Sequence, residues 1–122
     1  MLQLDWEICD TDDWCPLYAV DLTNPYFDNL GGVYIIFYLG SGKRKGKVVR
    51  VGQGVIMDRI AAHREEWQIK AHRQRDLLIT WAPVPYLQRD GVERYLASKW
   101  HPLVDARVPN VTSILVNSAF EE

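Results

Sequence analysis

A set of polar side chains in the middle of this chain could together cleave a phosphodiester bond. The set supplies a phenol, two guanidinium groups, an imidazole, one carboxylate and an amide, from Tyr34, Arg50, Arg59, His63, Glu93 and Asn110. Such cleavage needs an activated water, positive charge beside the non-bridging oxygens and help for the leaving oxygen. Because arginine suits phosphate and histidine can transfer protons, this chemistry needs no cysteine or serine nucleophile.

Glu93 is the carboxylate of this set, and a single carboxylate is sufficient for one kind of metal site. Magnesium keeps several waters and is commonly held by one or two carboxylates plus substrate phosphate oxygens. A Mg²⁺ or Mn²⁺ ion at Glu93 would act as a Lewis acid and a template. Residues 90–93 (DGVE) also fit a capping box, with Asp90 as the N-cap of a helix and Glu93 at its third position. The two roles can coexist.

Arg59 and His63 are four residues apart in a predicted helix, so their side chains share one face. A permanently charged guanidinium suits a scissile phosphate, and an imidazole beside it can donate or accept a proton. The alternative is an exposed pair with Glu66 as a surface ion-pair partner, which is a common and weak arrangement.

Tyr34 lies in an apolar run, residues 33–39 (VYIIFYL), which predicts a strand covered on both faces. The unperturbed pKa of a phenol is about 10, so Tyr34 would need nearby cations or a metal to act as a base. A tyrosine in such a run is also typical of an ordinary core, and both interpretations stay open.

The order and surroundings of these motifs resemble the GIY-YIG nuclease superfamily over about residues 31–110. Residues 32–34 (GVY) are similar to the first family signature. Residues 50–52 (RVG) are similar to the second, with Arg50 where the family has a tyrosine. The family also has an arginine followed four residues later by a histidine, and a glutamate early in the helix after the third strand. Arg59, His63 and Glu93 match these positions.

The resemblance implies a metal-dependent endonuclease that hydrolyses DNA, with RNA not excluded. It implies that Glu93 holds the metal, that Tyr34 and His63 handle the water and its proton, and that Arg59 binds the phosphate. The residues that would shape or tie together the site are Gly32, Gly52 and Asn110. It also implies an α+β (α/β) fold, in which helices flank a small mixed or antiparallel three-stranded sheet.

Arg50 leaves two interpretations open. Its guanidinium could bind the scissile or a flanking phosphate, or lower the pKa of Tyr34 as a nearby positive charge. It could equally mark a catalytically inactive module that binds nucleic acid on the same fold.

Charge is strongly segregated along the chain. Residues 1–30 hold seven acids and no lysine or arginine, whereas residues 43–75 hold ten bases and three acids, although the net charge is −2. A local basic face is what a polyanion requires, and a solvated loop and helix with scattered bases is the alternative. The bases expected to contact the nucleic-acid backbone are Lys43, Arg44, Lys45, Lys47, Arg50, Lys70, Arg73 and Arg75.

The 122 residues predict one ordinary domain, in which an acidic, aromatic-rich segment, residues 1–30, packs on a domain of residues 31–122. No apolar run is long enough for a membrane span, and the start of the chain does not resemble a signal peptide. We therefore expect a cytoplasmic protein with no membrane partner, whose two cysteines, Cys9 and Cys15, are reduced.

The periodicity predicts strands over residues 33–39, 47–52 and 76–84, and helices over residues 55–69 and 90–100. No separate specificity domain is visible, so a partner protein could supply specificity. A different class of function also remains open, in which the acidic segment at residues 1–30 acts as a protein-interaction or inhibitory surface. The sequence does not indicate the oligomeric state.

Overall fold

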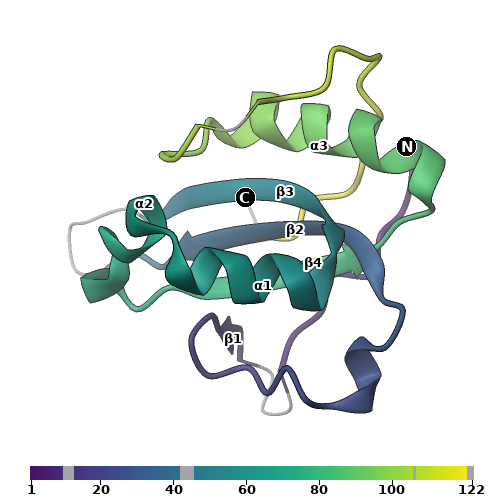
Figure 1. Cartoon of the computed structure of the whole chain (residues 1–122). Helices are drawn as coiled ribbons and strands as arrows, with labels where there is room; N and C mark the ends of the chain where they lie inside the picture. The colour runs from purple at the N-terminus through teal and green to yellow at the C-terminus, as the bar shows by residue number, and fades with distance from the viewer. Residues whose placement is uncertain (10–12, 42–45, 106, 121–122) are drawn as a thin grey trace.

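The computed structural model describes residues 1–9, 13–41, 46–105 and 107–120 (Figure 1). These residues form an α+β fold, in which a four-stranded antiparallel sheet is flanked by three helices. The strands are β1 (Cys15–Pro16), β2 (Gly31–Tyr38), β3 (Lys47–Val55) and β4 (Leu78–Pro83). The helices are α1 (Ile56–Glu65), α2 (Trp67–Lys70) and α3 (Tyr86–Trp100), with 3-10 turns η1 (Pro25–Phe27) and η2 (Arg73–Arg75).

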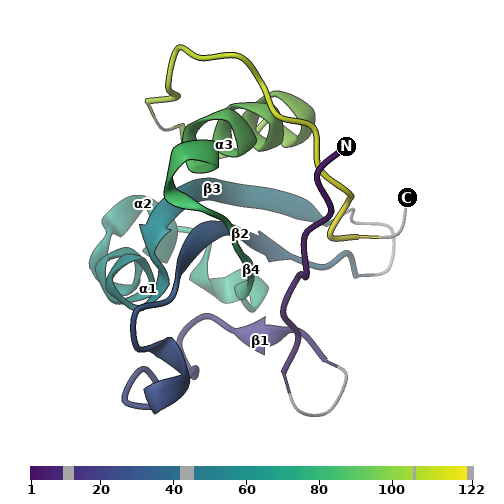
Figure 2. The same cartoon turned by 90° about the vertical axis from the view of Figure 1, so that its right-hand side faces the viewer.

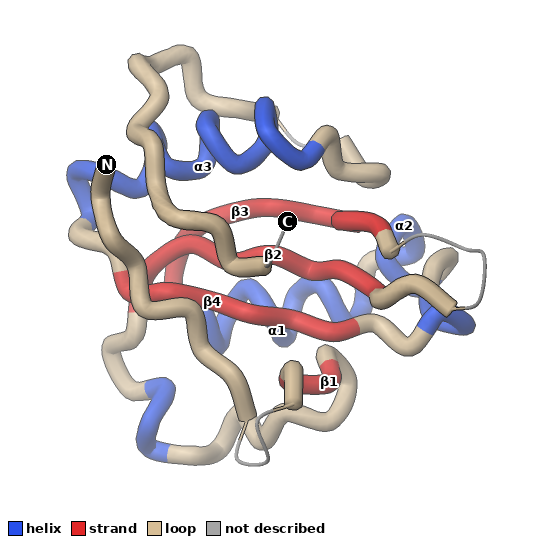
Figure 3. The backbone as a smooth tube through the Cα atoms, turned by 180° about the vertical axis from the view of Figure 1, so that it is seen from behind, coloured by secondary structure: helices blue, strands red, loops and turns tan. Residues whose placement is uncertain are grey.

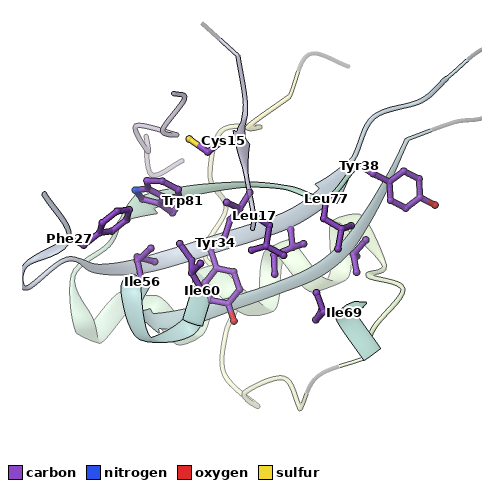
Figure 4. Close-up of a cluster of buried hydrophobic side chains, with 13 residues drawn as sticks. Cys15, Leu17, Phe27, Tyr34, Tyr38, Ile56, Ile60, Ile69, Leu77 and Trp81 are labelled. Carbon is purple, nitrogen blue, oxygen red and sulfur yellow. The ribbon is translucent and has the colours of Figure 1, made fainter. Parts of the chain in front are cut away.

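The apolar run of β2 forms the middle of the sheet, whose strand order is β1-β4-β2-β3 (Figure 3). Its side chains alternate between the two faces, and both faces are covered, as the sequence predicted. Tyr34 and Ile36 pack with Ile56 and Ile60 of α1 on one face (Figure 4). The opposite face packs against α3, so the sheet lies between α1 and α3 (Figure 2).

The sheet has four antiparallel strands where the sequence predicted three. The additional strand is β1, in the acidic N-terminal segment, which pairs Cys15 with Ile79 and Pro16 with Leu78 of β4. Arg64 of α1 also holds this segment, because its guanidinium donates hydrogen bonds to the carbonyls of Leu17 (2.8 Å) and Val20 (2.7 Å). The described part of residues 1–30 therefore shares its core with the rest of the chain.

Two helix boundaries differ from the prediction. The helix expected over residues 55–69 is interrupted at Glu66, whose backbone is extended, with φ −77° and ψ 128°. The helix expected to begin at Asp90 begins one turn earlier, with Pro85 as its N-cap. Proline suits a helix start because its fixed φ is compatible and it has no N–H to leave unpaired. Asp90 and Glu93 thus lie inside α3, and the predicted capping box is wrong.

Gly91 was interpreted as part of a helix start, and its actual role is close packing in α3. A Cβ at this position would lie 2.6 Å from Cγ1 of Ile114 and 2.8 Å from the carbonyl oxygen of Thr112. The carbonyl of Gly91 also accepts a hydrogen bond from the backbone N–H of Ile114 (3.0 Å). A glycine inside α3 thus allows the segment after the helix to return along it.

Cys9 and Cys15 form a disulfide, so the prediction of two reduced thiols is wrong. The bond links the segment before β1 to the first residue of β1, across residues that the structure does not describe. Among the described residues, no helix is both long and apolar enough to cross a membrane.

We expect Gly91→Ala to lower the free energy of unfolding by about 1–3 kcal/mol, because the added methyl group overpacks the contact with Ile114. In an open helix the same change would instead stabilise the protein by up to about 1 kcal/mol. Chemical denaturation measures the difference. Ser98→Ala, at an exposed position of the same helix, is the matched control and should be neutral or slightly stabilising. A Gly91→Ala variant as stable as the parent would contradict the close-packing role.

Candidate active site

Tyr34 occupies the centre of the candidate site, and the glycine opposite it on β3 makes room for its ring. In the sheet register Tyr34 pairs with Gly52 of β3 and with Trp81 of β4. A Cβ at Gly52 would lie only 2.5 Å from Cζ of Tyr34. Because Gly52 has no side chain, the ring can lie across β3 with its hydroxyl directed towards α1. The glycine of the RVG motif is therefore required sterically, because a side chain there would collide with the ring of Tyr34.

The hydroxyl of Tyr34 contacts both members of the predicted arginine–histidine pair. It makes a short hydrogen bond with Nε2 of His63, and it accepts a long one from Nε of Arg59, at 3.5 Å. Tyr34 is 1% exposed and His63 is fully buried, whereas Arg59 is partly exposed. The structure therefore brings together three of the predicted catalytic residues, from the middle strand and one face of α1.

His63 is neutral at physiological pH in this environment. Its pKa is lowered from 6.5 to about 4, mainly by burial and also by Arg50 and Arg59, against the opposing effect of the Glu66 carboxylate. The Oε1 atom of Glu66 lies 3.2 Å from Nδ1 of His63, although the two groups are not aligned as a hydrogen bond. This carboxylate favours a proton on Nδ1, which leaves Nε2 as the acceptor for the hydroxyl proton of Tyr34.

Tyr34 itself remains protonated. Burial raises its pKa above 10, and this effect outweighs the opposing effects of Arg59 and Arg50. Nearby cations do lower the pKa of Tyr34, as expected from the sequence, but the net change in this pKa is upward. If Tyr34 takes part in proton transfer, it must pass its own proton to His63, because a free phenolate is disfavoured at this position.

Glu93 approaches the site from the opposite face of the sheet. It projects from α3, is 7% exposed, and accepts a hydrogen bond of 3.3 Å from Nε2 of Gln53. Burial raises its pKa, against the opposing effects of Gln53 and then of Arg50. It makes no hydrogen bond or ion pair with Tyr34, Arg59 or His63 within the described part of the chain. Its influence on Tyr34 and Arg59 is electrostatic.

Arg50 connects the two halves of the site. It pairs with Ile36 in the sheet and so extends from the same face as Tyr34, half-buried, with Nε 3.3 Å from the carbonyl of Val51. Its positive charge lowers the pKa values of Tyr34, His63 and Glu93. Because β3 is an edge strand, groups from both faces of the sheet can meet beside it, and Arg50 lies among them.

Glu93 is the carboxylate that would hold the metal ion expected from the sequence. It lines a cavity of about 220 Å³ together with Val51, His101 and Asp105, which has room for a hydrated ion. A cation would stabilise the ionised form of a carboxylate whose pKa is raised by burial. In the described part of the chain no three acidic, histidine or cysteine side chains are placed to hold a metal. Magnesium at Glu93 would need substrate phosphate oxygens and water to complete its shell.

Gly32 and Asn110 were both expected to shape the site or to tie it together, and the structure places them in different surroundings. Gly32 packs against the backbone of β4, where a Cβ would lie 2.9 Å from the carbonyl carbon of Ala82. Asn110 is exposed in the segment after α3 and does not bridge elements of the site. Near Asn110, this segment is tied to α3 by a hydrogen bond from Arg94 to the carbonyl of Pro109, at 3.0 Å, in addition to the bond from the N–H of Ile114 to the carbonyl of Gly91.

The predicted nucleic-acid-binding bases are only partly described. Lys43, Arg44 and Lys45 lie outside the described residues. Lys47 is exposed at the start of β3, and Lys70 pairs with Glu65 at 3.5 Å. Arg73 and Arg75 lie over the rings of Tyr18 and Tyr38, at 4.6 and 4.2 Å from the ring centres. These four bases lie at the start of β3 and on α2 and η2, whereas Arg50 is the one predicted base within the described residues that adjoins the site.

Two residues of the site, Glu66 and Gln53, are not predicted from the sequence. Glu66 was considered only as a surface partner, yet the break between α1 and α2 places its carboxylate beside His63. Its i, i+3 spacing from His63 was the available signal. Gln53 was not considered, although it links β3 to both Asp90 and Glu93 of α3.

Comparison with protein-family models, with curated proteins and with solved structures found no match for this chain.

We expect the stability of the fold to fall as the pH drops from about 6.5 to about 4, because His63 gains its proton more readily in the unfolded chain. The folded pKa is the lower one, so the contribution is complete above pH 6.5 and is lost as the pH falls towards 4. The loss attributable to His63 is about 3 kcal/mol. Urea denaturation at a series of pH values measures it.

The variant His63→Gln should be less stable at pH 7 and should show a flatter pH dependence over the same range. His72→Gln, which changes a histidine outside the site, should keep the parent slope. An equal slope in the parent and in His63→Gln would contradict the assignment of this dependence to His63.

Proposed function

We propose that this chain is a metal-dependent endonuclease that hydrolyses DNA phosphodiester bonds, with a site similar to that of the GIY-YIG nucleases. The observation that carries the proposal is the placement of the Tyr34 hydroxyl between Nε2 of His63 and Nε of Arg59. An ordinary core tyrosine needs only one hydrogen-bond partner. Here the partners are a neutral histidine that can accept a proton and a permanent cation that can bind phosphate.

In this proposal, Tyr34 and His63 relay a proton from the attacking water. The water gives its proton to the Tyr34 oxygen while the phenolic proton moves to Nε2 of His63. The imidazolium that forms is stabilised by the carboxylate of Glu66, which lies 3.2 Å from Nδ1. The relay avoids a phenolate as the resting form, which the raised pKa of Tyr34 disfavours.

Arg59 controls access to this relay. Its guanidinium covers the buried hydroxyl of Tyr34 through a hydrogen bond whose 3.5 Å length makes it weak. An incoming phosphate offers the guanidinium a stronger, charge-assisted partner. Movement of Arg59 towards the phosphate would open the hydroxyl to water at the moment the substrate binds. Arg50 would bind the same or a flanking phosphate.

A divalent ion would be held by Glu93 and, when bound, would supply Lewis-acid stabilisation of the scissile phosphate. Glu93 and Tyr34 extend from opposite faces of the sheet, so substrate bound at the β3 edge would lie between them. The cytoplasmic location expected from the sequence, the identity of the nucleic acid and a specificity partner remain predictions.

The direct test is cleavage of plasmid, branched and single-stranded DNA by the full chain, with Mg²⁺, with Mn²⁺ and with a chelator. We expect cleavage only with a divalent ion, and its loss in Tyr34→Phe, which keeps the ring and removes the relay. Binding of DNA without cleavage under every metal condition would instead assign the chain to the inactive, nucleic-acid-binding class.

We expect Glu93→Gln to reduce metal-dependent cleavage by at least about 10²-fold, on the scale of losing one strong electrostatic stabiliser. The melting temperature should stay the same or rise, because a buried carboxylate is replaced by a neutral amide and no helix cap is lost. Asp90→Asn is the matched control, since Asp90 is an exposed acid of the same helix that also contacts Gln53. Parent-like cleavage by Glu93→Gln would remove Glu93 from the site.

We expect Arg50→Gln to shift the acidic limb of the cleavage–pH profile to higher pH. Arg50 lowers the pKa of Glu93, so removing its charge raises that pKa, and a higher pH is then needed to ionise the carboxylate that binds the metal. Arg50→Lys keeps the charge and should keep the position of the limb, even if its rate is lower. Identical limbs in Arg50→Gln and the parent would contradict the electrostatic role of Arg50.

A further inference from the structure

A second pocket lies at the opposite edge of the sheet from the candidate active site. Its volume is about 370 Å³, within the range of roughly 300–1,000 Å³ that is common for ligand sites. Both residues of β1, the other edge strand, line it, as do Phe27 and Trp81, and Cys15 of β1 lies near Trp81 in Figure 4. The remaining walls come from the acidic N-terminal segment, and they include aliphatic side chains such as Ile8 and Val20.

Glu7 is held in the wall of this pocket by both its backbone and its side chain. Its N–H donates to the carbonyl of Trp81 (2.8 Å), and its own carbonyl accepts from the hydroxyl of Thr80 (2.7 Å). The hydroxyl of Tyr26 donates to Oε2 of Glu7 (3.2 Å) and accepts from the indole N–H of Trp81 (3.1 Å). The carboxylate is therefore positioned in advance, and among the described residues no hydrogen bond occupies its Oε1 atom.

Asp21 supplies a second carboxylate among the residues that line the pocket. Its Oδ1 accepts hydrogen bonds from the N–H (3.0 Å) and the hydroxyl (2.6 Å) of Thr23, which lower its pKa and keep it ionised. None of the residues that line the pocket is a lysine or an arginine, and residues 1–30 contain neither type. The pocket is thus negatively charged, without a compensating base in its walls.

Three aromatic rings complete the pocket. Tyr26, Phe27 and Trp81 pack against one another, with ring centres 5.1 Å apart for Tyr26–Phe27 and 5.4 Å apart for Phe27–Trp81. Aromatic rings attract organic cations, and aliphatic walls cover the hydrocarbon stem that carries a charged group. Carboxylates with aromatic and aliphatic walls are the combination that suits a long cationic side chain, whereas a bare metal ion prefers a shell of oxygen ligands.

We propose that this pocket binds a lysine or arginine side chain of a basic polypeptide partner. The stem of that side chain lies against the aromatic and aliphatic walls, and its charged end lies between the carboxylates of Glu7 and Asp21. A polypeptide is the occupant to which the geometry points, because both residues of the edge strand β1 line the pocket, so that an extended chain lying along this edge would reach it. The proposal is independent of nuclease activity and of the site at Tyr34.

The test is titration of the full, oxidised chain with a short lysine-containing peptide, capped at both ends, followed by NMR of the indole N–H of Trp81. That N–H donates to the hydroxyl of Tyr26, which itself donates to Glu7, so a ligand bound at Glu7 should shift its signal. We expect a saturable shift with the lysine peptide and its arginine counterpart, and none with the matched norleucine peptide. Glu7→Gln and Asp21→Asn should each weaken binding by about tenfold or more, on the scale of losing one charge-assisted contact.

Asp28→Asn is the matched control, because Asp28 is an exposed acid of the same segment that does not line the pocket. It should bind the lysine peptide as the parent does. Equal binding of the norleucine peptide, or unchanged affinity in Glu7→Gln, would overturn the proposal. Tighter binding of free butylammonium than of the peptide would overturn the assignment to a polypeptide partner. Each variant is checked for correct folding by comparing the amide spectrum of its core residues with that of the parent.

Discussion

The buried hydroxyl of Tyr34 sets the constraint on which the candidate site depends. A hydroxyl in a dry core needs a hydrogen-bond partner, and an unpaired one costs about 1–3 kcal/mol. Here the partner is His63, and because His63 is itself fully buried, the imidazole is held neutral and can accept the proton. Gly52 is required for the same reason, since any side chain there would occupy the space of the phenol ring. The glycine, the neutral histidine and the protonated phenol all follow from the burial of the Tyr34 side chain between β3 and α1.

The position of β3 at the edge of the sheet decides how the other groups can join. Tyr34, Arg50, Arg59 and His63 lie on the α1 face, while Glu93 and its partner Gln53 lie on the α3 face. In a central strand the backbone on either side would separate the two groups. At an edge, their charges act on one another past the strand, as the common influence of Arg50 on Tyr34 and Glu93 shows. The backbone N–H groups of Leu103 and Val104 donate hydrogen bonds to the carbonyls of Val48 and Val49 of β3. These contacts lie before Arg50 in the strand, whereas Gly52 and the Tyr34 ring lie after it.

The opposite edge of the sheet has a different character, although it belongs to the same small core. There the N-terminal segment adds β1, is held by Arg64, and carries acids beside aromatic rings. The two ends of the chain also meet, through a parallel bridge between Leu2 and Val116 and two hydrogen bonds between Leu4 and the side chain of Asn117 (Figure 2). The acidic pocket and the Tyr34 site thus lie towards different edges of the sheet, although Arg64 and Arg73 of the basic stretch contact the N-terminal segment.

The sequence by itself determined the three long strands, the approximate positions of α1 and α3, and the types of residue in the site. The unbroken apolar run at Val33–Leu39 predicts a strand buried on both faces, and the i, i+4 spacing places Arg59 and His63 on one helix face, because both patterns are local. It could not determine that α3 begins at Tyr86, because proline and the DGVE motif offer competing helix starts. Nor could it determine the disulfide, the partnership of Gln53 with Glu93, or the exposure of Asn110. Only the tertiary structure decided these, since they depend on which segments meet across the sheet. The same is true of protonation. The neutral His63 and the raised pKa of Tyr34 result from burial, which is a property of the packed fold and not of any motif.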